Sequence, residues 1–305
     1  MNVHLPQNPE ETFSAKRLLT PVSMEEADFF AADYNMNLYR GCNHGCIYCD
    51  TRSECYHIED FDRIRYKENC LLMLERELRQ KKRPGIVSMG AASDPYNALE
   101  TRLCLTQQAL TLLGRYHFGA TVTTKGALIV RDADLYARIS RSVPVRVAFS
   151  ITTTDDDLST LIEPGASPSS ERFAALKVLS KAGVFAGVWI CPTLPFMTDS
   201  PETLQALLQT TADCGGRYVM CHFGMTLRTG NREYFYQALD KEPRLQGIKQ
   251  RYADAFGLSY MCPSPNAEAL YSLYVSEAKR LGLLYRFEDI NRAMGEGLPR
   301  QIAMF

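Results

Sequence analysis

The sequence lacks any run of about 18 apolar residues, the length that a membrane-spanning helix needs. It also lacks an excess of charge of one sign, because 34 Lys and Arg face 35 Asp and Glu, which gives a net charge of −1. The chain does not open on a basic segment followed by an apolar one, so we expect no signal peptide. These absences predict a cytoplasmic protein without a membrane partner, and the charge balance alone does not indicate a nucleic-acid binder.

The sequence has the composition of a globular protein, which excludes a disordered tail or a fibre. Hydrophobic residues make up 46% of its 305 residues and charged residues 23%. This length suits two domains or one α/β barrel with an appendage.

Cysteine is abundant, with ten residues in the chain. Disulfide scaffolds of secreted proteins are usually shorter and denser in cysteine, so we expect free thiols in a reducing compartment. Those inside apolar helical patterns, such as Cys70 and Cys104, are expected to be small buried side chains.

Short apolar or β-branched segments recur every 25 to 50 residues and predict strands. They cover residues 36–41, 86–91, 120–124, 145–151, 185–191 and 217–223.

Helical patterns lie between these strands, over residues 62–82, 106–117, 131–141, 169–182 and 199–213. Thr106 and either Ser169 or Ser170 are candidate N-caps. Pro201 suits a first helical turn, and Gly183 suits a helix end.

Six strand–helix units predict parallel strands with right-handed crossovers. We therefore expect an α/β fold, a partial (β/α)6 TIM-like barrel over residues 36–228, with a doubly wound open sheet as the alternative. Residues 1–35 would form an N-terminal extension. Residues 229–305 would form a helical C-terminal region, with helices over 232–240, 244–256 and 265–281.

The strongest chemical signal is the C-x3-C-x2-C motif of Cys42, Cys46 and Cys49, placed directly after the first predicted strand. Three thiolates at this spacing suit three corners of a [4Fe–4S] cluster and leave the fourth iron open to a ligand. Zinc is the alternative, with His44, Cys55 or His57 as a fourth ligand. No second C-x2-C pair is present, and such a pair is typical of structural zinc sites.

The motif and its place after the first strand of a βα repeat resemble the radical S-adenosylmethionine (SAM) superfamily. The resemblance implies a partial barrel and three cysteines that hold a [4Fe–4S] cluster, whose open iron binds SAM. It also implies that reduction cleaves SAM to methionine and a 5′-deoxyadenosyl radical, which abstracts a hydrogen from the substrate. An external one-electron reductant of flavodoxin or ferredoxin type would supply the electron.

Further segments resemble the spore photoproduct lyase-like branch of that superfamily, also described as DNA repair photolyase-related. They extend over about residues 36–195 and comprise Asn37–Gly41, Gly90–Tyr96 with Glu100, Thr123–Lys125, Phe149–Ser150, Glu163–Gly165 with Arg172, and Cys191–Pro192.

The resemblance implies SAM contacts at strand ends, where the ligands of barrel enzymes bind. Lys125 would pair with the SAM carboxylate, Ser150 would bind that carboxylate or the ribose, and Tyr48 would lie against the adenine. Ser93 and Asp94 complete the expected contacts, although Asp94 also suits a turn cap before Pro95. We expect Glu163 and Arg172 to form a structural ion pair.

Two positions depart from the lyase pattern. The lyase has a hydrogen-donating cysteine at the end of its second strand, where this sequence has residues 90–92 without cysteine, and Asp50 replaces a tyrosine after the third cluster cysteine. We therefore expect SAM cleavage to be retained, whereas the two departures put thymine-dimer splitting in doubt. Cys191 and Tyr96 are candidate substitute hydrogen donors, with Cys221 a further possibility.

The sequence predicts a radical SAM enzyme, lyase-like, that acts on a damaged or modified nucleic-acid base. One alternative is a radical SAM enzyme that acts on a small molecule or a peptide. The second alternative is a non-catalytic binding protein that a metal stabilises.

Overall fold

The computed structural model describes residues 11–23 and 31–296. Part of the predicted N-terminal extension (1–10 and 24–30) and the last nine residues of the predicted C-terminal region lie outside these ranges.

A seven-stranded sheet forms the centre of the molecule, in the order β10-β9-β8-β7-β6-β3-β2. Its strands are β2 (Leu19–Pro21), β3 (Tyr34–Met36), β6 (Ile86–Met89), β7 (Gly119–Thr124), β8 (Val145–Ser150), β9 (Ala186–Ile190) and β10 (Tyr218–Cys221). From β3 to β10 neighbouring strands are parallel and follow chain order, whereas β2 is antiparallel to β3. A doubly wound sheet would reverse its strand order, so the predicted partial barrel is confirmed and its alternative is wrong.

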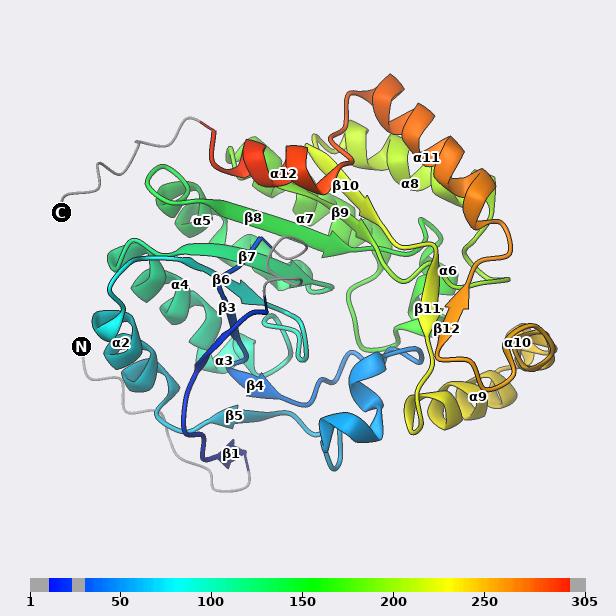
Figure 1. The fold of residues 1–305 in the computed structure, drawn as a ribbon, viewed down its shortest axis with the longest axis horizontal. Helices are drawn as coiled ribbons and strands as arrows, with labels where there is room; N and C mark the ends of the chain where they lie inside the picture. Colours follow the sequence, from blue (N-terminus) through cyan, green and yellow to red (C-terminus); the bar gives the residue numbers. More distant parts are fainter. Residues whose placement is uncertain (1–10, 24–30, 297–305) are drawn as a thin grey trace.

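Helices cover the outer side of this sheet (Figure 1). They are α2 (Cys70–Gln80), α4 (Leu105–Arg115), α5 (Ala133–Ile139), α7 (Ser169–Lys181) and α8 (Pro201–Asp213), with the 3-10 turn η3 (Ala127–Asp132) before α5. Two short helices, α3 (Glu100–Leu103) and α6 (Asp156–Ile162), come directly before α4 and after the end of β8. Apolar side chains of helices and strands form one buried core, which includes Leu74, Leu110, Val122, Val147 and Val188. This core fixes the strands, and so fixes where their carboxyl ends point.

Two boundaries near the cysteine motif were predicted wrongly. The first strand ends at Met36, and β4 (Tyr39–Arg40) instead joins a small second sheet with β1 (Thr12–Phe13) and β5 (Arg65–Lys67). The predicted helix over 62–82 therefore begins only at Cys70, because residues 65–67 pair antiparallel with β4. The apolar helical spacing was real, but it belongs to the second half of that segment alone.

The predicted helix ends have mixed outcomes. Pro201 lies in the first turn of α8, as expected, and the Ser200 side chain caps this helix. Thr106 is no cap, because its hydroxyl donates to the carbonyl of Pro95. The N-cap residue of α7 is Pro168 rather than a serine, and the carboxylate of Asp156 accepts the backbone N–H of Ser170.

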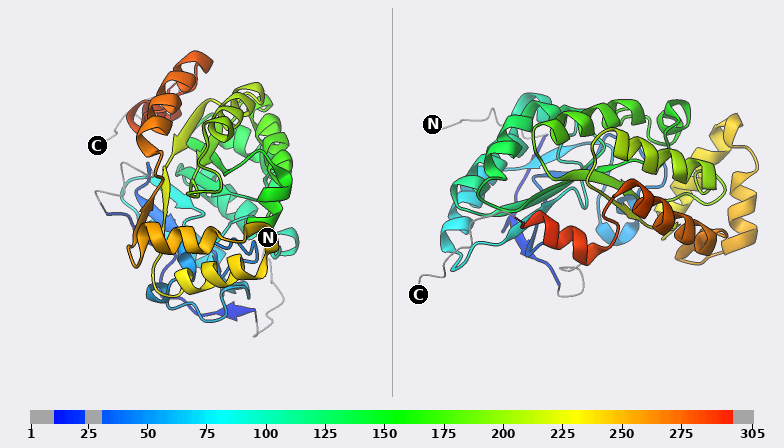
Figure 2. Two further views of the ribbon diagram at one scale, coloured as in Figure 1. Left: turned by 90° about the vertical axis from the view of Figure 1, so that its right-hand side faces the viewer. Right: turned by 90° about the horizontal axis from the view of Figure 1, so that it is seen from above.

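The C-terminal part contains α9 (Asn231–Lys241), η4 (Pro243–Leu245), α10 (Ile248–Phe256), α11 (Ala267–Leu281) and α12 (Phe287–Met294). It also contains two strands that the sequence did not predict, β11 (Gly224–Thr226) and β12 (Met261–Pro263), which pair antiparallel. Helix α11 lies along α8, whereas α9 and α10 lie beyond the carboxyl ends of the sheet strands (Figures 1 and 2). The C-terminal part therefore reaches the end of the barrel where site residues are expected.

Candidate active site

The predicted cluster cysteines lie on one loop between β4 and the 3-10 turn η1 (Asp50–Arg52). Gly41 and Gly45 adopt φ angles of +79° and +67°, and a Cβ at Gly41 would lie 2.5 Å from a backbone oxygen. Glycine at Gly41 therefore lets the chain turn sharply into the loop.

The three thiols of this loop are close enough to influence one another electrostatically. Burial and the carboxylate of Asp94 raise the pKa of Cys42 to about 12. Burial also raises the pKa of Cys46 well above its ordinary value, and the charges on Cys49 and Cys42 add to that rise. Burial therefore favours the protonated forms of Cys42 and Cys46, and their thiolates suit a ligand that compensates negative charge.

The segment that follows α6 holds this loop in place. The backbone N–H of Ile47 donates to Ile162 at 2.9 Å, and that of Gly165 donates to His44 at 2.8 Å. A Cβ at Gly165 would lie 2.1 Å from the carbonyl oxygen of Asn43, so a side chain there would push the two segments apart.

A buried chain of polar groups connects the loop to the end of β8. The Tyr48 hydroxyl donates to one oxygen of Glu163, and Arg172 pairs with the other. The side chains of Glu163 and Arg172 are both fully buried. Arg172 also donates to the carbonyl of Ser150 at 2.9 Å. Glu163 and Arg172 are the expected ion pair, and they also fix the hydroxyl end of Tyr48.

Lys125 follows β7 and brings a positive charge to the cysteine loop. Its Nζ atom lies 5.6 Å from the centroid of the Tyr48 ring. Burial acts to lower the pKa of Lys125, but its interactions with the Cys46 side chain and the Glu163 carboxylate outweigh burial, and the net shift of the pKa is upward. The ammonium group therefore stays charged beside the thiols.

Ser93 and Asp94 connect the cysteine loop with the ends of β6 and β7. The Ser93 hydroxyl donates to the Gly41 carbonyl at 2.5 Å. One oxygen of Asp94 accepts from the Tyr96 N–H at 2.8 Å, and the other accepts from the Lys125 N–H at 2.8 Å. The Asp94 carboxylate thus makes the turn-capping bond that was the alternative to SAM binding, and its role toward SAM stays a prediction.

His44 faces this carboxylate, with its Nδ1 atom 3.4 Å from Asp94. Burial lowers the pKa of His44, which favours the neutral imidazole.

The structure separates the two candidate hydrogen donors. The carbonyl of Cys191, next to β9, accepts from the Ser150 hydroxyl at 3.1 Å. Burial raises the pKa of the Cys191 thiol to about 11, and the charge of Lys125 opposes that rise. The Tyr96 hydroxyl lies elsewhere, 3.0 Å from Asp132 and 2.9 Å from the Tyr136 hydroxyl. Cys191 therefore lies in the electrostatic surroundings of Lys125, whereas Tyr96 belongs to a different polar cluster.

Sequence reasoning missed the role of Asp50, which it treated only as a departure from the lyase pattern. Its carboxylate accepts from Tyr56 and from Thr226 of β11, each at 3.1 Å, and lies 3.5 Å from Arg228. Asp50 thus joins the end of the cysteine loop to the C-terminal part. No sequence signal pointed to this contact, because 176 positions separate Asp50 from Thr226.

The donor set fits an iron–sulfur cluster better than a single metal ion. Within residues 11–23 and 31–296, no three His, Cys, Asp or Glu side chains converge closely enough to hold one ion. A zinc ion needs its sulfur ligands about 2.3 Å from one point. A four-iron cluster binds each thiolate at a separate iron atom, so three cysteine thiols on one loop fit such a cluster.

Comparison with known families decides the classification. The family model of the radical SAM superfamily matches residues 36–208, more than half of the chain. The chain belongs to the radical SAM superfamily. This confirms the superfamily that the cysteine motif predicted. The match includes the cysteine loop, Lys125, Ser150 and Cys191.

Curated relatives of this radical SAM protein are uncharacterized. One from Mycobacterium tuberculosis strain H37Rv is 34% identical over 209 residues, which cover 66% of this chain and 61% of the relative. One from Methanocaldococcus jannaschii is 28% identical over 188 residues, which cover 61% of this chain and 68% of the relative. The matched part of the chain thus spans only about 61% of the length of the mycobacterial relative.

Solved structures with the same fold include spore photoproduct lyase complexed with dinucleoside spore photoproduct. Its TM-score is 0.66 at 17% identity, with 90% of this chain and 81% of that chain covered. The radical SAM methyltransferase TsrM from Kitasatospora setae has a TM-score of 0.54 at 11% identity, with 86% and 61% covered. These likenesses establish the fold. In the described part of this chain, no helix is long and apolar enough to cross a membrane.

Proposed function

We propose that this protein cleaves SAM with one [4Fe–4S] cluster held by Cys42, Cys46 and Cys49. The observation that carries the proposal is the single loop of three thiols, two of which, Cys46 and Cys49, interact electrostatically with Lys125. When bound, the cluster supplies the electron that splits SAM into methionine and a 5′-deoxyadenosyl radical. The electron would come from an external reductant of flavodoxin or ferredoxin type.

The surrounding residues would bind and orient SAM. The Lys125 ammonium would pair with the SAM carboxylate, a charged hydrogen bond worth about 1.5–3 kcal/mol. Tyr48, anchored by Glu163, would present its ring to the adenine. Ser150 would bind the carboxylate or the ribose. Ser93 and Asp94 would act mainly by fixing the position of the cysteine loop relative to Lys125.

Cys191 is our candidate for the hydrogen donor that the second strand lacks. No side chain fits at Gly90, because a Cβ there would lie 2.0 Å from the Thr123 carbonyl oxygen. Cys191 keeps its proton near neutral pH, because burial raises its pKa. Its S–H bond would give a hydrogen atom to a carbon radical, which forms a C–H bond and leaves a sulfur radical. One electron from the external reductant and one proton would restore the thiol.

A nucleic-acid base is the substrate class that we favour. Arg228 lies 4.5 Å from the ring centroid of Tyr260, and Tyr56 approaches Arg228 through their shared partner Asp50. Both tyrosines are 42% exposed. Exposed aromatic rings beside arginine are a common platform for unstacked bases. The similar fold of the lyase complexed with a dinucleoside spore photoproduct supports the same class.

Formation of 5′-deoxyadenosine tests the SAM-cleaving activity. The protein is reconstituted anaerobically with iron and sulfide, reduced with dithionite, and incubated with SAM. We expect 5′-deoxyadenosine from the wild-type protein and none from Cys46→Ala. Intact SAM together with about one bound zinc would instead support the non-catalytic binding protein.

Deuterium labelling tests Cys191 without a known substrate. A thiol exchanges its hydrogen with solvent, so SAM cleavage in D2O is expected to place deuterium in 5′-deoxyadenosine when Cys191 donates to the nearby radical. Cys191→Ala is expected to lower this label, with Cys214→Ala as the control. Equal labelling in all three proteins would exclude Cys191 as the donor.

Oligonucleotide binding tests the substrate class. We expect salt-dependent binding of a fluorescent single-stranded oligonucleotide, weakened in a Tyr260→Ala variant. Absence of binding at low salt would favour the alternative, a small molecule or a peptide.

A further inference from the structure

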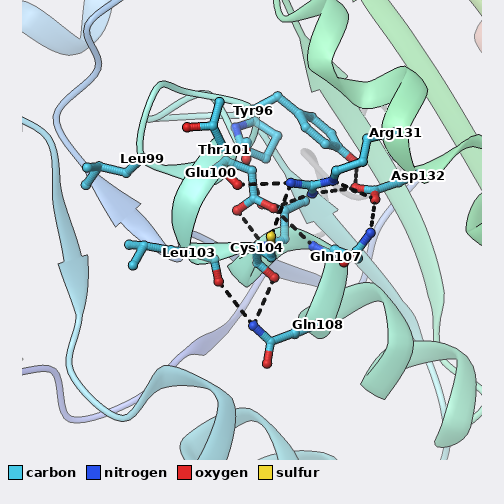
Figure 3. Close-up of polar contacts among 12 residues, drawn as sticks. Tyr96, Leu99, Glu100, Thr101, Leu103, Cys104, Gln107, Gln108, Arg131 and Asp132 are labelled. Carbon is cyan, nitrogen blue, oxygen red and sulfur yellow. Dashed lines mark hydrogen bonds and ion pairs between the residues drawn. The ribbon is translucent and has the colours of Figure 1, made fainter. Parts of the chain in front are cut away.

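A second buried cluster of charged groups lies beside the candidate site, outside its SAM contacts. Arg131 pairs with Glu100 at 2.6 Å and with Asp132 at 2.8 Å (Figure 3). The side chains of Glu100 and Asp132 are fully buried, and that of Arg131 is 24% exposed. Each carboxylate also accepts from a tyrosine, Tyr39 at 2.5 Å on Glu100 and Tyr96 at 3.0 Å on Asp132. We call these five residues the Glu100 junction.

The two tyrosines belong to the two segments that meet at the cysteine loop. Tyr39 lies on β4, three positions before Cys42. Tyr96 lies two positions after Asp94, and its backbone N–H donates to the Asp94 carboxylate. A direct bond from Ser93 to the Gly41 carbonyl links the same two segments. The Glu100 junction therefore links these two segments a second time, in addition to the bond from Ser93 to Gly41. Together the two links close a ring of hydrogen bonds.

The Glu100 junction has an excess of one negative charge, so its carboxylates need the hydrogen bonds that the two tyrosines donate. Two buried carboxylates face one guanidinium, so one negative charge has no cation of its own in the junction. Neutral donors compensate it: the two phenols, the backbone N–H of Thr106 on Glu100 at 2.9 Å, and the Gln107 amide on Asp132 at 2.5 Å. Burial, and then the charge of Glu100, hold the pKa of Tyr39 far above its ordinary value. The phenol therefore keeps the proton that it donates.

We propose that the Glu100 junction positions the cysteine loop relative to the loop of residues 93–96, and that Tyr39 and Tyr96 are its two positioning residues. Its expected effect on SAM rests on the proposed function, whereas its effect on the thiols does not. Loss of either phenol breaks the same link, because Glu100, Arg131 and Asp132 connect the two tyrosines in series.

Tyr39→Phe and Tyr96→Phe test the proposal, with Tyr136→Phe as the matched control. Tyr136 is buried and shares a hydrogen bond with Tyr96, but it contacts neither loop through the junction. The first readout is the rate at which iodoacetamide alkylates Cys42 in the full-length, metal-free protein, relative to Cys214 in the same sample. The second is the dissociation constant for SAM of the reconstituted protein, at equal iron content.

We expect each test variant to alkylate Cys42 faster and to bind SAM more weakly, by about three- to tenfold, the range for one buried hydrogen bond. The double variant is expected to match the single variants, because residues in series are not additive. Tyr136→Phe is expected to keep both wild-type values even if it unfolds at a lower temperature.

Wild-type alkylation of Cys42 in both test variants would overturn the proposal. So would equal effects of Tyr136→Phe, since these would indicate general destabilisation. If the alkylation rates change as expected but the wild-type protein binds no SAM, the junction stands and the proposed function fails. If Tyr96→Phe lowers the rate of 5′-deoxyadenosine formation while Cys42 alkylation and SAM binding stay unchanged, Tyr96 acts as a hydrogen donor and not as a positioning residue.

Discussion

The surroundings of the cysteine loop and the C-terminal helices α9 and α10 differ in the burial of their ion pairs. Around the loop, the ion pair of Arg172 with Glu163 is fully buried on both sides. In α9 and α10, the pair of Lys249 with Asp240 is 45% and 54% exposed, and aromatic rings supply the core. The ring centroids of Tyr252 and Phe235 lie 5.1 Å apart there.

This difference has a physical consequence. Buried charged hydrogen bonds have narrow geometric tolerance, and removing one partner leaves the other charge without compensation. Aromatic contacts and surface pairs tolerate small shifts, because they are less directional. We therefore expect the region around the cysteine loop to be more rigid than α9 and α10.

The largest effect is expected from Cys46→Ala, which removes the most buried of the three loop thiols. We expect reconstituted Cys46→Ala to bind no stable cluster, because two thiolates cannot hold the cube. Iron and sulfide analysis measures this, with Cys214→Ala as a control that keeps wild-type iron. Normal iron in Cys46→Ala would refute the ligand assignment.

Arg172→Met tests the rigidity of the site and is expected to lower the free energy of unfolding by about 3–5 kcal/mol. The uncompensated Glu163 carboxylate would remain buried beside Tyr48. Lys249→Met, in the exposed pair, is expected to cost less than about 1 kcal/mol. Urea titration of both variants measures the contrast, and equal losses would contradict the comparison.

Lys125→Ala is expected to weaken SAM binding by at least about tenfold while iron content stays normal, because one charged hydrogen bond is lost. Isothermal titration of the reconstituted protein provides the measurement. Lys177→Ala, on the exposed side of α7, serves as the control. Unchanged SAM affinity in Lys125→Ala would remove Lys125 from the site.

Arg251→Ala tests the region of α9 and α10 and has the smallest expected effect. The Arg251 guanidinium lies 4.1 Å from the ring centroid of Phe196, a cation–π contact worth about 0.5–1 kcal/mol at an exposed site. We expect a loss of stability of this size and unchanged SAM cleavage. A loss as large as that of Arg172→Met would show that this region is as rigidly coupled as the cysteine loop.

The sequence predicted the regular part of the fold because its strands carry long signals. β7 to β10 are buried strands with apolar or β-branched residues, and their order follows from the chain. β4, β5, β11 and β12 have only two or three residues each, too few for a periodic pattern. Their pairing depends on distant partners, which a local pattern does not contain.

The position of the candidate site residues along the fold was predictable in part. The resemblance and the rule that ligands bind at strand ends singled out Lys125, Ser150 and Cys191, which lie at or directly after the ends of β7, β8 and β9, and their roles toward SAM stay predictions. The direction of the Tyr96 side chain was not readable, because it depends on Asp132, 36 positions away. The acceptor of the Tyr48 hydroxyl, Glu163, is 115 positions away.

Electron paramagnetic resonance of the reconstituted, dithionite-reduced protein tests the central claim most directly. Spectra are recorded before and after the addition of SAM, in the wild-type protein and in Lys125→Ala. The account predicts the signal of one reduced [4Fe–4S] cluster that changes when SAM binds, with a higher SAM concentration needed in Lys125→Ala. A wild-type cluster signal that saturating SAM leaves unchanged, or no cluster signal at all, would contradict it.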